Sequence, residues 1–256
     1  MINQDRLVNT FLDLVRIDSP SGSEGEAAQY VAGVLRELGL EPRIDEMGNV
    51  TARLEGKGKP LLLSAHMDNV EPGRGITPVI ENGDIKSDGK TVLGADDLAG
   101  VAAILEGLRS LIEDQAEHIP LELAITTQEE VGLAGAKGLD LEQFKAKEGV
   151  VLDSGGAVGK ITISAPTHNE LDATITGKAA HSGSSPEKGI DAIRIAAEAI
   201  THMKLGRIDK ETTANIGMIR GGTARNAVPE QVDLTGEARS RNPKKAERQI
   251  KAMKQA

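Results

Sequence analysis

The sequence predicts an α/β fold: a mixed, mostly parallel sheet with helices on both faces, and an inserted ferredoxin-like α+β unit that is incomplete. Three strand-length apolar runs, 61–63, 121–127 and 150–152, alternate with helical spacing, which is typical of a largely parallel sheet. After Pro166 the order becomes strand, helix, strand, strand, helix, which is that of a ferredoxin-like unit without its last strand.

The expected elements of the first unit follow from apolar spacing and from helix stops such as Gly39. In chain order they are helices at 5–16 and 24–38, strands at 41–44, 50–54 and 61–63, a helix at 98–111, and strands at 121–127 and 150–152. Ligands of open α/β sheets bind outside the carboxyl ends of the strands. The polar residues that follow three of these strands are therefore expected to meet in one cleft.

The second unit is predicted from the segment after Ala165. Its expected elements are a strand at 171–176, a helix at 190–204, strands at 214–219 and 231–239, and a last helix from Pro243. We therefore divide the 256 residues into a larger unit, 1–165, and a smaller unit, 166–256.

Composition excludes several classes of protein. A net charge of −9 has the wrong sign for a nucleic-acid partner, and two Phe, one Tyr and no Trp leave no aromatic platform for stacked bases. The sequence shows no signal peptide and no run long enough to span a membrane, so a cytoplasmic protein is expected. Because Cys is absent, any metal ion must be held by His, Asp and Glu.

His66 and Asp68 follow the first of the three apolar strands, and the period of two places both side chains on one side of an extended segment. One can bind a metal ion while the other orients it, although a strand end that turns into a polar loop is an alternative. Asp96 and Asp97 precede the next helix, where one Asp alone is best explained as a helix cap. Two adjacent Asp exceed what a cap needs, and a carboxylate there can bridge two cations.

Glu129, Glu130 and Asp153 follow the other two apolar strands. Neighbouring side chains of a strand point in different directions, so one Glu can face a metal ion while the other faces a substrate as general base. Taken alone, the two Glu are better explained as a solvated acidic loop, and Asp153 as a turn residue. The convergence of three strand ends is what favours a metal site.

Two residues of the second unit are weighed in the same way. His181 lies between a strand and a helix, where it could donate to a substrate oxygen, but its position alone favours an ordinary loop His. Asn226 lies in the Gly-rich segment 221–229, and its position alone favours a turn.

These residues occur in motifs whose order and spacing resemble those of M20 metallopeptidases, with the nearest similarity to the peptidase T-like branch. The motifs of the first unit are His66-x-Asp68, Gly94-Ala95-Asp96-Asp97, Thr127-Gln128-Glu129-Glu130-Val131-Gly132 and Val151-Leu152-Asp153. Those of the second unit, which resemble the family's lid domain, are Gly177-Lys178-Ala179-Ala180-His181-Ser182-Gly183 and Pro186-Glu187-Lys188-Gly189. The resemblance covers nearly the whole chain and implies a zinc-peptidase-like catalytic domain with an inserted lid.

The resemblance also implies a role for each candidate. The implied ligands of two divalent metal ions, zinc or alternatively cobalt or manganese, are His66, Asp96, Glu130 and Asp153, with Asp96 shared by both ions. The implied catalytic residues are Asp68, which orients His66, and the general base Glu129. The implied substrate contacts from the lid, which also forms a homodimer, are His181, Asn226 and Arg239.

The implied activity is hydrolysis of peptide bonds in short peptides, as an aminopeptidase acting on tripeptides, through a water bridged by two metal ions. The same metal centre could instead serve an amidase or deacylase of N-acyl amino acids. The family's second metal site uses a His near the C-terminus that has no counterpart in the 256 residues. The resemblance therefore implies a C-terminally truncated chain and leaves open an inactive fragment that only binds metal or dimerises. A smaller departure is Leu98, where relatives often have Lys.

Overall fold

The computed structural model describes residues 1–256, which form two compact units, Met1–Ala157 and Val158–Ala256. The division falls in the irregular segment between the strands at 149–151 and 167–176. The boundary expected from the sequence, at 165/166, lies in the same segment, next to the strand at 167–176.

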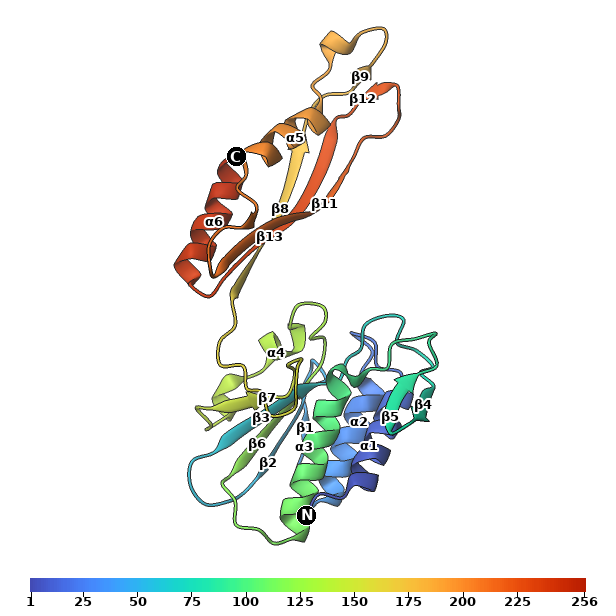
Figure 1. Cartoon of the computed structure of the whole chain (residues 1–256), viewed down its shortest axis with the longest axis vertical. Coiled ribbons are helices and arrows are strands. Elements are labelled where there is room, and N and C mark those ends of the chain that lie inside the picture. The colour runs from blue at the N-terminus through green and yellow to red at the C-terminus, as the bar shows by residue number, and fades with distance from the viewer. The chain divides into compact units, whose positions relative to one another are not determined.

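The first unit contains every helix and strand that the sequence predicts for it, together with a hairpin and short helices that were not predicted (Figure 1). Its elements are, in chain order, α1 (Gln4–Arg16), α2 (Gly25–Glu37), β1 (Arg43–Ile44), β2 (Val50–Leu54), β3 (Leu61–His66), β4 (Pro78–Glu81), β5 (Asp84–Ser87), α3 (Ala95–Glu113), β6 (Leu121–Thr126), α4 (Ala134–Gly138), a 3₁₀ turn (Leu141–Gln143) and β7 (Gly149–Val151). The hairpin β4–β5 turns at Asn82 and Gly83, which both have positive φ. This dipeptide is a strong hairpin signal that the sequence analysis did not use.

The sheet of the first unit is mixed, with the order β1-β2-β6-β3-β7. The pairs β3–β6 and β3–β7 are parallel, and the pairs β1–β2 and β2–β6 are antiparallel. The three parallel strands are the three apolar runs of the sequence. Their carboxyl ends therefore lie at the same end of the sheet, which is where the candidate residues follow them.

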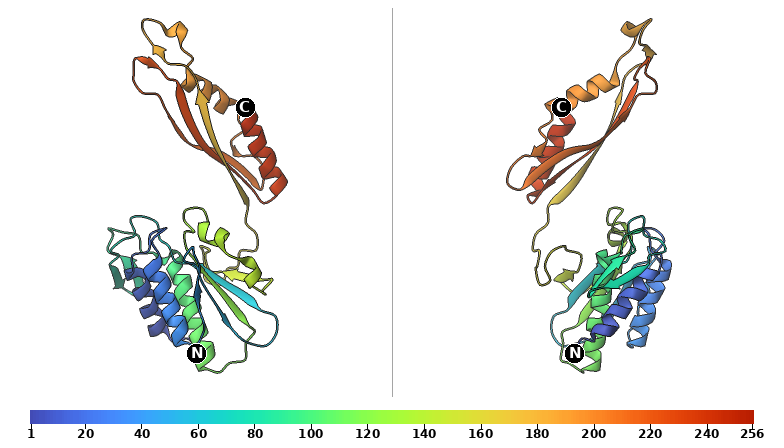
Figure 2. Two further views of the ribbon diagram at one scale, coloured as in Figure 1. Left: turned by 180° about the vertical axis from the view of Figure 1, so that it is seen from behind. Right: turned by 45° about the vertical axis from the view of Figure 1, so that its right-hand side comes forward.

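Helices α1, α2 and α3 cover one face of this sheet, and their apolar side chains form its core (Figures 1 and 2). Val50 of β2 and Leu123 and Ile125 of β6 are fully buried in this core. Leu98 of α3 is also fully buried there, so this departure from the family pattern is a core residue. Because large aromatic side chains are almost absent, many aliphatic side chains fill the core instead.

The second unit is an α+β sandwich of one antiparallel sheet and two helices. Its elements are β8 (Thr167–Thr176), β9 (Ala180–His181), a 3₁₀ turn (Pro186–Lys188), α5 (Ala192–His202), β10 (Gly206–Arg207), β11 (Thr212–Gly221), β12 (Ala227–Val228), β13 (Gln231–Ser240) and α6 (Pro243–Gln255). The sheet order is β10-β11-β13-β8, and Val232, Leu234 and Ala238 of β13 are buried. This arrangement agrees with the predicted ferredoxin-like order. None of the helices in either unit combines the length and the apolar character of a membrane span.

A buried ion pair joins α1 to α3. The Glu106 side chain is 1% exposed, and its carboxylate accepts from Arg6 Nε at 2.6 Å, from Asn3 N–H at 2.7 Å and from the Ser110 hydroxyl at 3.0 Å. The Arg6 guanidinium also donates to Glu113 at 2.8 Å. The bond from Arg6 is the main reason that the pKa of Glu106 falls to about 2, although burial opposes the shift.

Glu106→Gln is expected to lower the free energy of unfolding at neutral pH by about 2 kcal/mol, because a hydrogen bond to a charged group contributes roughly 1.5–3 kcal/mol. Since the pKa of the folded state lies below the ordinary value of 4.5, this contribution is complete above that value and is lost as pH falls towards 2. Urea unfolding of both proteins at neutral and acidic pH measures it. An equal difference at both pH values would contradict the assignment.

Candidate metal centre

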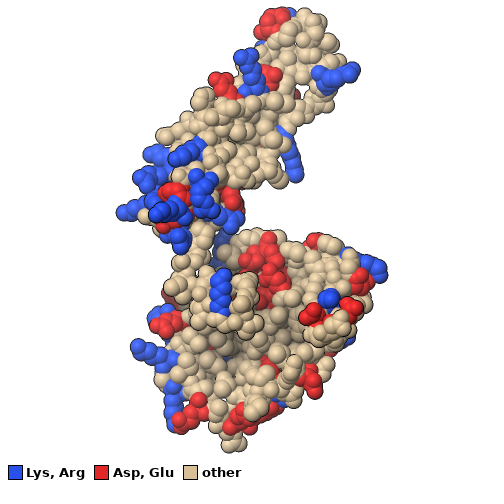
Figure 3. Space-filling model, in the orientation of Figure 1, with Lys and Arg blue, Asp and Glu red and all other residues tan.

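Four elements bring imidazole and carboxylate side chains to one end of the five-stranded sheet. His66 is the last residue of β3, Glu129 and Glu130 follow β6, Asp153 follows β7, and Asp96 lies in the first turn of α3. The parallel pairing of these three strands places their carboxyl ends together. Figure 3 shows acidic side chains gathered at this end of the first unit, where α3 begins.

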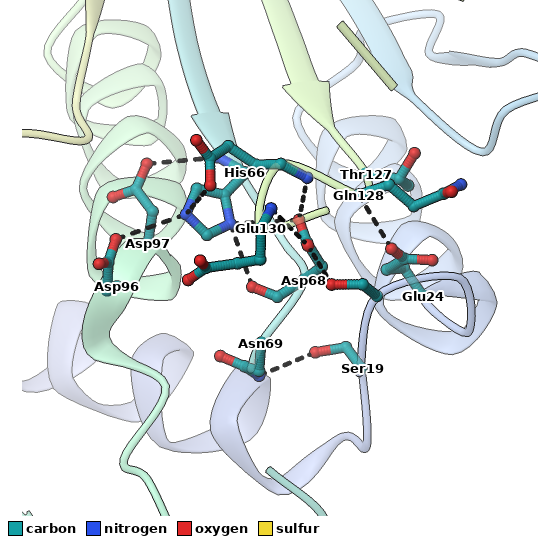
Figure 4. A network of polar contacts seen from close by, with 12 residues as sticks. Ser19, Glu24, His66, Asp68, Asn69, Asp96, Asp97, Thr127, Gln128 and Glu130 are labelled. Atoms are coloured by element: carbon teal, nitrogen blue, oxygen red, sulfur yellow. Dashed lines mark hydrogen bonds and ion pairs between the residues drawn. The ribbon is translucent and has the colours of Figure 1, made fainter. Parts of the chain in front are cut away.

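The His66 ring has one anchored nitrogen and one nitrogen without a partner. Nδ1 lies 3.0 Å from the backbone oxygen of Asp68 and 3.3 Å from its carboxylate. Because both oxygens can only accept, Nδ1 carries the proton, and Nε2 of the neutral ring keeps its lone pair. Nε2 is buried without a hydrogen-bond partner, 3.4 Å from Asp96 Oδ1 (Figure 4) and 4.0 Å from Glu129 Oε2. A lone pair directed at carboxylate oxygens is unfavourable, so Nε2 needs either a proton or a metal ion between itself and these oxygens.

The electrostatics of the group also favour a cation. One ligand atom from each of His66, Glu129 and Asp153 lies within 4.8 Å of the others. Burial, together with the neighbouring Asp96, raises the pKa of Asp153 to about 6 despite the opposing charge of His66. Burial alone would lower the pKa of His66, but the surrounding carboxylates, first of all Asp68, raise it to about 9. Imidazole and carboxylate ligands without Cys suit zinc, manganese and related divalent ions.

Asp68 ties the end of β3 to the turn that carries the two Glu. Its carboxylate is fully buried and accepts from Glu129 N–H at 2.9 Å, from Glu130 N–H at 3.2 Å and from the Ser21 hydroxyl at 2.6 Å. Burial would raise the pKa of Asp68, but the bonds from His66, Ser21 and the two N–H groups lower it to about 2. Asp68 therefore stays ionised and can fix the orientation of a metal-binding imidazole.

The two Asp of α3 differ in their surroundings. The Asp96 side chain is 75% exposed, whereas Asp97 is 3% exposed and its Oδ2 accepts from the backbone N–H of His66 at 3.3 Å. Burial, together with the charges of Asp153 and Asp96, raises the pKa of Asp97 to about 7 although His66 opposes the shift. Gly94 precedes α3, and no side-chain hydrogen bond caps the helix there, which agrees with the expectation that two adjacent Asp do more than cap a helix. Both have non-helical backbone angles; the Asp96 carboxylate lies beside the His66 ring, and the Asp97 carboxylate bonds to the His66 backbone.

The two Glu are neighbours at the same centre. The family resemblance implies that Glu130 is a metal ligand and that Glu129 is the general base. In the structure, however, it is Glu129 that lies in the three-ligand group with His66 and Asp153. Burial and the charge of Glu129 raise the pKa of Glu130 above its ordinary value. The division of roles between them stays a proposal.

His181 belongs to the second unit, where it ends β9 and pairs with Ala227 of β12. Its Nδ1 accepts from the N–H groups of Gly183 at 3.1 Å and Ser184 at 3.2 Å. Because Nδ1 accepts, the neutral ring carries its proton on Nε2. The exposed His181 can therefore act as a hydrogen-bond donor.

Asn226 and Arg239 also belong to the second unit. The Asn226 backbone oxygen accepts from Ser182 N–H at 3.0 Å, and its side chain is exposed. The Arg239 guanidinium donates to both carboxylate oxygens of Glu237 at 2.9 Å. A substrate carboxylate that binds Arg239 would have to compete with Glu237.

The loop before α2 supplies contacts that the sequence analysis did not predict. Ser21 bonds to Asp68, and the buried Glu24 accepts from Gln128 N–H at 3.0 Å. The loop was interpreted only as a connection because Ser and Gly are ordinary loop residues. The one available signal was Glu24 itself, since a Glu stands where a short polar cap is preferred.

Two family profiles match the chain. The profile described as Peptidase dimerisation domain, M20_dimer, matches residues 167–256, and the profile of Peptidase family M28 matches residues 49–198. The first covers most of the second unit, and the second covers the segment with the candidate metal ligands.

Solved structures give closer matches. The aminopeptidase PepT from Bacillus cereus has a TM-score of 0.90 and 46% identity over 99% of this chain and 71% of its own. A tripeptidase from Staphylococcus aureus has a TM-score of 0.94 and 42% identity over 100% of this chain and 71% of its own.

Curated relatives show the same similarity. The uncharacterized protein YqjE from Bacillus subtilis is 46% identical over 100% of this chain and 72% of its own length. A Peptidase T from Clostridium perfringens is 29% identical over 79% of this chain and 61% of its own length. The chain thus spans between 61% and 72% of the length of these four proteins.

Proposed function

Because the chain belongs to the M20 family of metallopeptidases, we propose that it hydrolyses peptide bonds in short peptides, as an aminopeptidase acting on tripeptides. The similarity to an aminopeptidase and to a tripeptidase supports the reaction and the substrate class. The observation that carries the proposal is the buried His66 Nε2, which has no partner and faces the carboxylates of Asp96 and Glu129.

The proposed cofactor is a pair of divalent metal ions, for which zinc is the first candidate. His66, Asp96 and Asp153 would hold one ion, and Asp96 and Glu130 would hold the other. When bound, such ions act as Lewis acids that polarise a peptide carbonyl and lower the pKa of water. The raised pKa of Asp153 supports this assignment, because a divalent cation would offset the burial and the neighbouring negative charges that raise it.

In this proposal the protein's own residues handle the proton and the charge of the transition state. Glu129, whose side chain is 28% exposed, takes a proton from water and passes it to the leaving amine. His181 donates its Nε2–H to the oxygen that gains negative charge. Asn226 and Arg239 bind the substrate. The match of residues 167–256 to a dimerisation domain supports a homodimer formed through the second unit, and we propose a cytoplasmic location.

The protein with added zinc or cobalt is expected to release the N-terminal residue from an unblocked tripeptide and to leave the N-acetylated tripeptide intact. The physical reason is that an aminopeptidase binds the free ammonium group, which acetylation removes. Chromatography of the released amino acids measures this, with an N-acyl amino acid as a third substrate. Release from the N-acyl amino acid alone would favour the deacylase, and the absence of metal-dependent hydrolysis would contradict the proposal.

A further inference from the structure

The turn that follows β6 is held by side chains from three separate segments. Its four successive backbone N–H groups, from Thr127 to Glu130, donate to the side chains of Asn49 at 3.1 Å, Glu24 at 3.0 Å and Asp68 at 2.9 and 3.2 Å. Figure 4 shows Gln128 beside Glu24, and Glu130 beside Asp68. The turn lies outside the regular helices and strands. Its shape therefore depends on these acceptors, and two of them, Asn49 and Glu24, have no part in the proposed reaction.

Glu24 breaks a local rule of helix formation. It occupies the position before α2, where Ser, Thr, Asp or Asn is preferred, and it makes no side-chain bond to the first turn of the helix. The residue is 4% exposed, and Oε1 accepts instead from Gly22 N–H at 2.9 Å and from Gln128 N–H at 3.0 Å. Burying a carboxylate is costly, and sites that break a local rule are often functional.

Gln128 is the residue at which the chain changes direction. Its φ of +52° lies in the left-handed region, which is uncommon for residues other than Gly. The next two residues are Glu129 and Glu130. A change in the backbone at Gln128 would redirect both carboxylates. Glu24 bonds to the backbone N–H of Gln128 and to neither of the two Glu side chains, so its effect on them would pass through this backbone.

We propose that Glu24 is a positioning residue of the metal centre: by accepting the Gln128 N–H, it sets the direction in which Glu129 and Glu130 leave the turn. Asp68 holds the next two N–H groups from the end of β3, so two buried carboxylates fix the turn from two sides. The inference rests on the proposed function, which assigns proton transfer and metal binding to these two Glu.

The test compares Glu24→Ala and Glu24→Gln with a matched control, Glu26→Ala. Glu26 lies in the first turn of the same helix and is exposed. Because both bonds of Glu24 end on Oε1, the Gln variant keeps the acceptor, whereas the Ala variant removes it.

Glu24→Ala is expected to lower kcat on a tripeptide by about 10- to 100-fold and zinc affinity by about tenfold, with KM nearly unchanged. Glu24→Gln and Glu26→Ala are expected to stay within about threefold of the original protein in both quantities, since each keeps the contact with Gln128. A residue that only stabilises the fold would not lower kcat while leaving KM nearly unchanged.

A second measurement does not depend on activity. Amide hydrogen exchange followed by NMR, without added metal, is expected to be at least about tenfold faster at Gln128 in Glu24→Ala than in Glu26→Ala. If the Ala variant does not fold, Glu24→Asp takes its place, because its shorter side chain keeps the charge but not the reach.

Two results would overturn the inference: a folded Glu24→Ala or Glu24→Asp protein with normal Gln128 exchange, or a Glu24→Gln protein as impaired as the Ala variant. If the original protein binds no zinc and cleaves no peptide, the proposed function fails. The exchange comparison then still decides whether Glu24 positions the turn.

Discussion

Glu129→Gln is expected to lower kcat for tripeptide hydrolysis by about 10²- to 10⁴-fold and to change zinc affinity by only a few-fold, because general acid–base catalysis contributes a rate factor of that size. The Gln side chain keeps the shape of the Glu but cannot take a proton from water. Steady-state kinetics and zinc titration of the same preparation separate the two effects.

The neighbouring Glu130 provides the decisive comparison. If the proposed roles hold, Glu130→Gln lowers zinc affinity, and added zinc restores part of the lost activity. The control is Glu142→Gln, an exposed residue of the same unit that is expected to behave like the original protein. Loss of zinc affinity in Glu129→Gln, with normal affinity in Glu130→Gln, would show that the roles are exchanged. The position of Glu129 within the three-ligand group makes this outcome worth testing.

The second large effect is expected at His66. His66→Gln is expected to lower zinc affinity by more than about 100-fold, since loss of a ligand should exceed the 10- to 100-fold effect of losing a residue that only orients one. Activity at limiting zinc should fall with it. The four other His of the chain lie outside this group, so none of them replaces the lost imidazole.

His118→Gln is the matched control for this variant. The His118 ring forms a hydrogen bond with the neighbouring backbone oxygen of Ile119 at 2.9 Å, and it lies on the loop before β6. Isothermal titration of apo-protein with zinc measures both variants. Unchanged zinc affinity in His66→Gln would contradict the proposal that His66 is a ligand of the metal centre.

The parts of the fold that were predicted are those whose signals are local. Apolar runs and helical spacing gave β3, β6, β7 and the long helices, because burial on a sheet face imposes a pattern on consecutive residues. The ten-residue strand β8 was predicted only from residue 171 onward. Its first four residues, from Thr167 to Glu170, are all polar and give no apolar signal. The antiparallel pairing of β2 with β6 depends on contacts between distant segments, so no single stretch could show it.

The candidate site shows the same division. Sequence motifs pointed to His66, Asp96 and Asp153 as residues that the strand ends would bring together, and the structure places them at one end of the sheet. The burial of Asp97 and the contact of Glu24 with Gln128 were not predicted. Both depend on segments tens of residues apart in the chain, and neither residue type indicates such a contact by itself.

The central claim is that this chain holds divalent metal ions at the His66 end of the sheet and uses them to cleave peptides. The most direct test removes all metal from the protein with a chelator and then follows tripeptide hydrolysis as zinc is added back. The account predicts no hydrolysis by the metal-free protein, and hydrolysis that rises with zinc until the protein is saturated. Hydrolysis by the metal-free protein, or none at any zinc concentration, would contradict it.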